Sequence, residues 1–125
     1  MSMEMLTRVL EVIVGLGLLN VWLLRAGSST GYRGGNAKTL REEFAAYGLP
    51  SSVFYIVGTL KVTAGVILLA SLFLPLPQPA RISALVVACL MVGALAMHIK
   101  VKDPMIKSVP AALMLVMCAG IVALL

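Results

Sequence analysis

Apolar residues fill four long stretches of the chain, and shorter polar segments separate them. The stretches cover residues 5–24, 52–74, 82–99 and 105–125. Each is close to the roughly 20 residues that a helix needs to cross the hydrocarbon core of a bilayer. The links after the second and third stretches are short, which places consecutive helices antiparallel. The pattern therefore predicts an all-α integral membrane protein, with residues 1–125 forming one antiparallel four-helix bundle.

The one long connection, residues 25–50, divides into two parts. Its first half is rich in glycine and hydroxyl side chains, which is typical of a loop. Its second half predicts a short amphipathic helix at about residues 38–48, where Thr39 and Glu42 have the spacing of a capping box and Gly48 supplies a left-handed stop. Three large side chains share one face of that helix: Leu40, Phe44 and Tyr47. Such a helix lies at the membrane interface or folds back as a lid over the bundle.

Composition agrees with a membrane protein, because 61% of the residues are hydrophobic and only 12% are charged. That balance excludes an ordinary soluble enzyme. The net charge is +5, and its cations flank the apolar stretches. We therefore interpret the charge as contact with the lipid bilayer and not with nucleic acid.

The distribution of Lys and Arg predicts an orientation. Most of these residues lie in the long connection and the third link, while Arg8 and Arg81 lie toward the other side. The positive-inside rule then places the loops in the cytoplasm and both termini outside the cell membrane. Labelling of a cysteine at Ser28 only from the outside would contradict this orientation.

Two charged residues, Glu11 and Lys61, fall inside predicted spans, where an unpaired charge is costly. Glycines share the helix face of each, which favours packing inward. Counted from the span centres, their depths differ by about 7 Å, a gap that two long side chains can bridge. Two interpretations stay open: a structural ion pair between Glu11 and Lys61 that fixes helix register, or a wet, charged floor of a cavity between the helices.

His98 lies near the loop-side end of the third span. It is either an interfacial hydrogen-bonding residue or one that handles a ligand or proton. No second metal ligand follows it at helical spacing, so no metal site is predicted. Phe54 shares the helix face of Lys61. The candidate ligand-binding residues are therefore Glu11, Phe54, Lys61 and His98, and no catalytic residue is assigned.

Several short motifs add to this pattern. They are FAAYGLP at residues 44–50, YIVGTLKVTAG at residues 55–65, and His98 shortly before Asp103-Pro104. With the four spans, they make almost the whole chain resemble the DoxX-like group of small membrane proteins. Members of that group often have an acidic residue about where Lys61 stands here. The resemblance implies a four-helix fold, and relatives are linked to quinone-coupled sulfur oxidation, to membrane redox complexes and to the assembly of other membrane proteins.

Two functions follow as expectations. The first is an accessory or binding protein with an intramembrane polar site for a lipid-like ligand or a partner membrane protein, which includes a second copy of the chain. The alternative is a small quinone-binding subunit of a membrane oxidoreductase, in which Lys61 and His98 donate to the two carbonyls. Quinone is the one cofactor considered, and no haem, flavin or iron–sulfur motif is present. The sequence favours a non-catalytic role and leaves enzymatic activity open.

Overall fold

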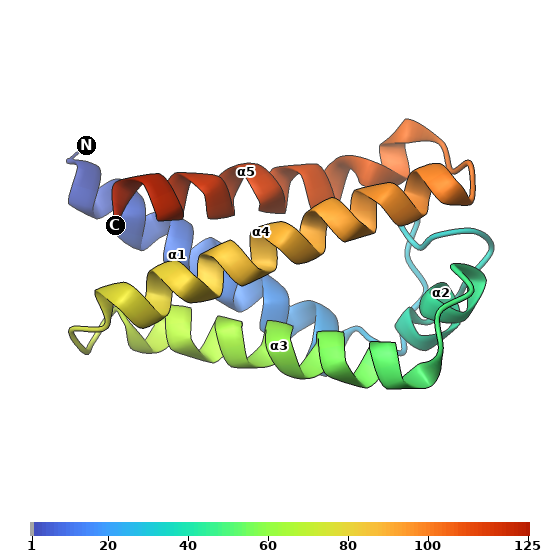
Figure 1. The fold of residues 1–125 in the computed structure, drawn as a ribbon, viewed down its shortest axis with the longest axis horizontal. Helices are drawn as coiled ribbons and strands as arrows, with labels where there is room; N and C mark the ends of the chain where they lie inside the picture. The colour runs from blue at the N-terminus through green and yellow to red at the C-terminus, as the bar shows by residue number, and fades with distance from the viewer. Residues whose placement is uncertain (1) are drawn as a thin grey trace.

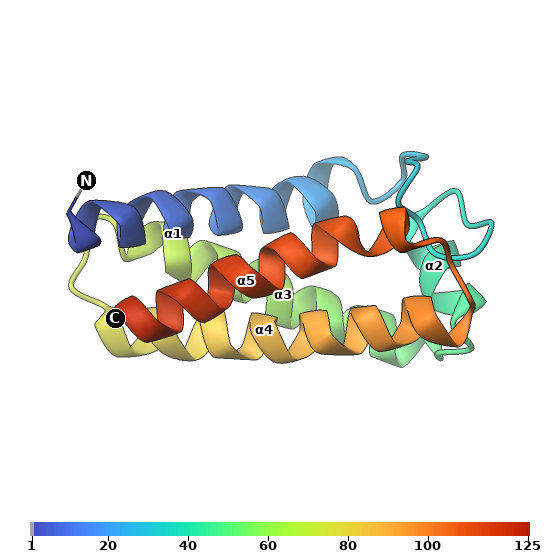
Figure 2. The same ribbon diagram turned by 90° about the horizontal axis from the view of Figure 1, so that it is seen from above.

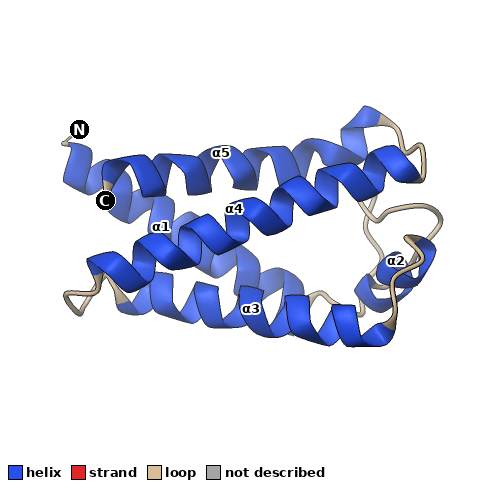
Figure 3. Ribbon diagram, viewed as in Figure 1, coloured by secondary structure: helices blue, strands red, loops and turns tan. Residues whose placement is uncertain are grey.

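The computed structural model describes residues 2–125, and every regular element in them is helical (Figure 3). The long helices are α1 (Met3–Leu19), α3 (Ser51–Ala70), α4 (Pro77–Lys100) and α5 (Val109–Leu124). A π-helical turn, η1 (Asn20–Leu24), extends α1, and a 3₁₀ turn, η2 (Met105–Ser108), precedes α5. The short helix α2 (Leu40–Ala46) lies in the first loop.

The helices form an antiparallel bundle, as the hydrophobic pattern predicts. Each long helix packs against two neighbours: α1 against α3 and α5, and α4 against α3 and α5. Both termini lie at one end of the bundle, and α2 with the third link lies at the other (Figures 1 and 2). We call these the terminal end and the loop end.

Helix ends depart from the sequence expectation most clearly between the second and third spans. The helix α3 ends at Ala70, and residues 71–74 form turns and a bend. The second apolar stretch, in contrast, continues to residue 74. The helix α4 begins at Pro77, five residues before the expected start at residue 82. Proline is well suited to the first helical turn, where its missing N–H would have no helical partner.

The outer faces of the long helices carry large apolar side chains that no part of the protein covers. Examples on four different helices are Leu16, Val66, Val92 and Val116, all more than half exposed. Four helical segments are long and apolar enough to span a bilayer: Met3–Leu24, Ser51–Ala70, Pro77–Lys100 and Met105–Leu124. Lipid is the natural cover for these faces, and the chain is a multi-pass membrane protein.

Glycines set the contact between α1 and α3. A Cβ on Gly15 would lie 2.7 Å from Leu69 Cγ, and one on Gly65 would lie 3.2 Å from the Gly15 carbonyl oxygen. Farther toward the loop end, a Cβ on Gly58 would lie 2.6 Å from the ring of Trp22. These close approaches fix which residues of the two helices face one another.

The helix α2 caps the loop end of the bundle. Its capping box is formed: the Thr39 hydroxyl accepts from the Glu42 N–H, and the Glu42 carboxylate accepts from the Thr39 N–H. The Lys38 N–H also donates to the Glu42 carboxylate, and this bond together with that from the Thr39 N–H holds the pKa of Glu42 below its ordinary value. Gly48 adopts a left-handed conformation with φ of 79°, which ends the helix as predicted. Leu40 and Tyr47 are buried, so α2 packs inward on the bundle.

Candidate functional site

Two cavities lie between the helices, at opposite ends of the bundle. The terminal-end cavity measures about 480 Å³ and includes Glu11 and Ser71 in its lining. The loop-end cavity measures about 330 Å³. Its lining combines apolar side chains with polar and charged ones: Gly17, Leu18, Asn20, Val21, Trp22, Arg25, Thr30, Tyr32, Arg33, Leu40, Glu43, Lys61, Met91, Ala94, His98, Lys107, Pro110, Ala111 and Met114.

The ion pair expected between Glu11 and Lys61 does not form. Glu11 is 4% exposed, and its carboxylate accepts a hydrogen bond from the Ser71 hydroxyl at the terminal end. Lys61 lines the loop-end cavity, and its Nζ lies 5.8 Å from the centroid of the Trp22 ring. Within residues 2–125, the ion pairs closer than 4.0 Å do not include Lys61.

Helix register explains the separation. Gly15 faces Gly65 and Leu69, so Glu11, one turn earlier in α1, faces the end of α3. Lys61 instead lies one turn before Gly65 and is level with the end of α1. The two charged residues are therefore about eight residues, or roughly 12 Å, apart along the helix axes. The estimate from the span centres was too small because it assumed that the two centres are level. Gly15, near the centre of the first span, faces Gly65 and Leu69, which lie well beyond the centre of α3 toward the terminal end.

Aromatic side chains form one wall of the loop-end cavity. Trp22, at the π-helical turn, packs edge-on against Phe44 of α2 with centroids 5.9 Å apart. Its ring also lies 5.2 Å from that of Phe54. Phe54 stands behind Trp22, in a shallow outer groove that also includes Tyr55. Phe54 thus supports the wall of the cavity and does not line it.

His98 is buried and belongs to a polar cluster at the loop end, which we call the Asp103 latch and which comprises Asp103, His98, Lys107 and Gly35. His98 Nδ1 lies 2.7 Å from Asp103 Oδ2. The Gly35 N–H donates to Asp103 Oδ1 at 3.0 Å, and Lys107 Nζ donates to the Gly35 carbonyl at 2.7 Å. The latch therefore joins the first loop to the link between α4 and α5.

Electrostatics in the latch favour an ionised Asp103. Burial alone would raise the pKa of this carboxyl group, because the charged form loses water. The hydrogen bonds from His98 and Gly35, together with the charge of Lys107, outweigh burial and bring the pKa of Asp103 below its ordinary value. Asp103 thus acts as a fixed negative centre at the loop end.

A second set of contacts holds α2 in place. Lys100 Nζ donates to the Tyr47 carbonyl oxygen at 2.7 Å. The Tyr47 hydroxyl donates to Glu43 Oε1 at 2.5 Å, and Arg33 pairs with Glu43 Oε2 at 3.5 Å. Burial and the nearby Glu43 carboxylate raise the pKa of Tyr47 above its ordinary value, so this hydroxyl stays a donor.

A family model agrees with this architecture. The model described as DoxX-like matches residues 10–121, nearly the whole chain. The chain belongs to the DoxX-like family. A comparison with curated proteins and one with solved structures each gave no match.

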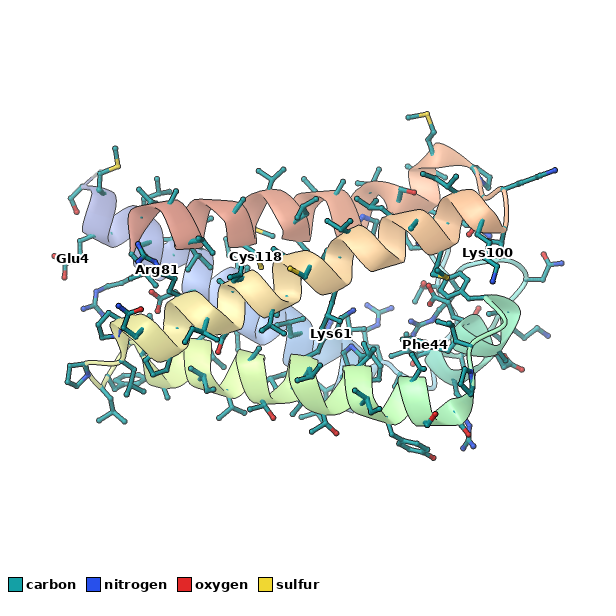
Figure 4. The ribbon with its side chains drawn as sticks, viewed as in Figure 1. Glu4, Phe44, Lys61, Arg81, Lys100 and Cys118 are labelled. Atoms are coloured by element: carbon teal, nitrogen blue, oxygen red, sulfur yellow. The ribbon has the colours of Figure 1, made fainter. Side chains whose placement is uncertain are left out.

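In this DoxX-like chain, two of the four residues proposed from the sequence, Lys61 and His98, line one cavity. Glu11 lines the other cavity, and Phe54 lies behind the wall. Figure 4 shows Lys61 between the helices and Phe44 of α2 at the loop end.

Sequence reasoning missed several lining residues of this DoxX-like site. From the sequence alone, Trp22 is interpreted as an anchor at the membrane interface. Its position as the one tryptophan, near the end of a span, was the available signal for a wall of the cavity. Arg33 and Glu43 lie in the connecting segment, and nothing in the sequence pattern indicates that Arg33 returns to the bundle. A lid was an open interpretation of α2, and the placement of Leu40 and Glu43 in the cavity lining agrees with it.

Proposed function

We propose that this DoxX-like protein is an accessory or binding protein that holds an amphipathic, lipid-like molecule in the loop-end cavity. The observation that carries the proposal is the setting of Lys61. Its ammonium group lies within a membrane-spanning helix and, within residues 2–125, has neither a carboxylate within 4.0 Å nor a hydrogen-bond acceptor. A bound head group with acceptor oxygens would supply the hydrogen-bond acceptors that Lys61 lacks within the protein.

Energetics support an occupant. A lysine at the centre of a membrane helix costs about 2.5–3.5 kcal/mol on insertion scales. The contact with the Trp22 ring returns about 0.5–2 kcal/mol and leaves the donor hydrogens without acceptors. Other lining residues are apolar, among them Leu18, Met91 and Met114. The lining therefore offers contacts both to a polar head group and to a hydrocarbon chain.

The size and cover of the cavity fit this function. Its volume of about 330 Å³ is at the small end of the range for ligand pockets, roughly 300–1,000 Å³. That is enough for a head group and the first part of a chain, with the remainder in the bilayer. The helix α2 contributes Leu40 and Glu43 to the lining, so it acts as the lid.

Filling the cavity tests the proposal. The chain has one tryptophan, Trp22, and it lines the cavity, so its fluorescence reports occupancy. In phosphatidylcholine nanodiscs, 4-bromododecyl phosphate, which carries its bromine close to the head group, is expected to quench Trp22 saturably. Ala94→Leu adds three carbons inside the cavity and is expected to weaken binding about tenfold, through loss of space for the ligand.

The matched control is Ala96→Leu, which adds the same atoms at an exposed position of α4. It is expected to leave the quenching curve unchanged. Quenching that rises linearly with probe concentration, without saturation, would show only partition into the bilayer. That result would refute a binding cavity.

A quinone-binding subunit is the second candidate, supported by the presence of Lys61 and His98 in one lining. The two side chains would donate to the two carbonyl oxygens of the ring. A redox partner would have to carry the electrons to and from that quinone. Saturable quenching by decylubiquinone that Lys61→Ala leaves unchanged would remove this mechanism.

A further inference from the structure

We infer that the head group bound in the loop-end cavity is an anion, a phosphate or a carboxylate, held by Lys61 in a lining that also includes Arg33. This inference rests on the proposed function and names the class of its ligand. It follows from three observations: the balance of charge in the lining, the donors left without partners, and the apolar side chains in the same lining.

Charge in the lining is strongly unbalanced. Four lining residues carry positive charge, Arg25, Arg33, Lys61 and Lys107, whereas Glu43 is the one acidic residue among the lining side chains. Glu43 is already engaged by Arg33 and by the Tyr47 hydroxyl. A cationic head group would therefore meet repulsion, and an anionic one would meet unused positive charge.

Lys107 is neutralised by its neighbours and does not explain the excess. Its Nζ lies 3.8 Å from Asp103 and donates to the Gly35 carbonyl oxygen. Arg25 is exposed and reaches water. The positive charge that faces the membrane interior without a neutralising partner is therefore the charge of Lys61.

Arg33 adds a buried hydrogen-bond donor that has no partner. Its side chain is 7% exposed and fixed by three contacts: NH1 to Glu43, and NH2 to the carbonyl oxygens of Arg25 and Ser28. Its Nε is buried and, within the described residues, is the one buried side-chain nitrogen or oxygen atom without a hydrogen-bond partner. A buried donor of this kind is rarely left empty in a folded protein. Arg33 belongs to the cavity lining, but Nε itself has almost no accessible surface, so an acceptor oxygen meets it only if the guanidinium shifts on binding.

Both free groups, Lys61 Nζ and Arg33 Nε, are donors that cannot accept. A neutral alcohol can satisfy one of them, whereas an anion offers several acceptor oxygens and the opposite charge. Leu18, Met91 and Met114 line the apolar part of the same cavity, which favours an anion attached to a hydrocarbon chain over free phosphate.

The test compares three probes in the Trp22 quenching assay: 4-bromododecyl phosphate, 4-bromododecanol, and inorganic phosphate as a competitor. The phosphate amphiphile is expected to bind about tenfold more tightly than the alcohol, and added salt is expected to weaken only the former. Millimolar inorganic phosphate is expected to displace it weakly, because the chain contributes to binding.

Variants assign the effect to residues. Lys61→Met keeps an unbranched side chain one atom shorter, removes its charge and is expected to reduce the preference for phosphate over alcohol to about twofold or less. Arg33→Lys keeps the charge but removes Nε–H and the paired contacts of the guanidinium to Glu43, Arg25 and Ser28, and it is expected to lower the affinity for the phosphate probe more than that for the alcohol. Lys38→Met is the control, because Lys38 is exposed and does not line the cavity.

Each outcome has a separate meaning. Equal affinity for the two amphiphiles in the wild-type chain overturns the anion assignment and leaves the proposed function standing. Saturable binding of neither amphiphile refutes the proposed function itself. Displacement by inorganic phosphate at the concentration at which the amphiphile binds supports the anion but contradicts a lipid-like ligand. The salt dependence is measured on the unaltered chain, so the test does not depend on the folding of any variant.

Discussion

Replacing Asp103 by asparagine is expected to release the first loop and to lower the free energy of unfolding by about 2–4 kcal/mol. The Asp103 side chain is 4% exposed and is contacted by His98, Lys107 and the Gly35 N–H. An amide keeps the shape but offers one acceptor oxygen and no charge. At least one buried donor therefore loses its partner.

Thermal unfolding in nanodiscs and limited trypsin digestion measure this effect. Cleavage after Lys38 and Arg41 is expected to become faster, because the loop that carries these sites is less firmly held. Glu4→Gln is the control, because Glu4 is 78% exposed and pairs with Arg8 at 3.4 Å on the surface, where such pairs contribute about 0–1 kcal/mol. Equal stability of the two variants would show that the latch does not hold the loop.

Lowering the pH is expected to release the first loop without any substitution, because Asp103 becomes protonated. The pKa of Asp103 lies below its ordinary value of 3.8. The stabilisation is therefore complete above that ordinary value and is lost as the pH falls through the lower, folded-state pKa. The protection of the Gly35 amide against hydrogen exchange, taken relative to the intrinsic rate at each pH, is expected to fall in that range. In Asp103→Asn this protection is expected not to change with pH.

Gly15→Val is expected to lower stability by about 1–3 kcal/mol, because it forces α1 and α3 apart. The first added carbon would already lie 2.7 Å from Leu69 Cγ and 3.2 Å from the Gly65 carbonyl oxygen. The flexible Leu69 can turn away, but the backbone oxygen cannot without moving the helix. The second and third carbons of valine increase the conflict.

Unfolding of the purified chain in mixed micelles, followed by Trp22 fluorescence, measures the loss. Gly93→Val is a matched control on α4, where an added Cβ meets no atom within 4 Å. It is expected to be neutral or slightly stabilising, since glycine is a poor residue for a helix interior. If both variants unfold alike, helix propensity and not close packing governs the α1–α3 contact.

Features of this chain that depend on local sequence were predictable. The four spans follow from runs of apolar residues, and α2 follows from Thr39, Glu42 and Gly48, whose effects act within a few residues. Both cap signals were confirmed because hydrogen bonds close to the helix end satisfy them without help from the rest of the protein.

Features that depend on register were not predictable in the same way. Whether Glu11 meets Lys61 depends on which turns of α1 and α3 are level, and Gly15, Gly65 and Trp22 decide that through contacts between helices. The glycine stripes indicated that backbones approach closely, but they did not give the residue that each one faces.

The loop posed a different difficulty. Arg33 lies in a glycine-rich segment with no periodicity, so no pattern connects it with the membrane interior. Its position depends on hydrogen bonds to the carbonyl oxygens of Arg25 and Ser28, which exist only after the loop has folded.

The π-helical turn Asn20–Leu24 is closed by a hydrogen bond from the Arg25 N–H to the Asn20 carbonyl oxygen at 2.9 Å. This turn accommodates one residue more than an α-helical turn would, at the end of α1. Excision of a single residue here would let this turn close as an ordinary α-helical turn and would redirect the side chains within it, Trp22 among them, while the Gly15 contact stays as it is. A relative could therefore exchange the aromatic group in the cavity wall by a one-codon deletion, without rebuilding the bundle.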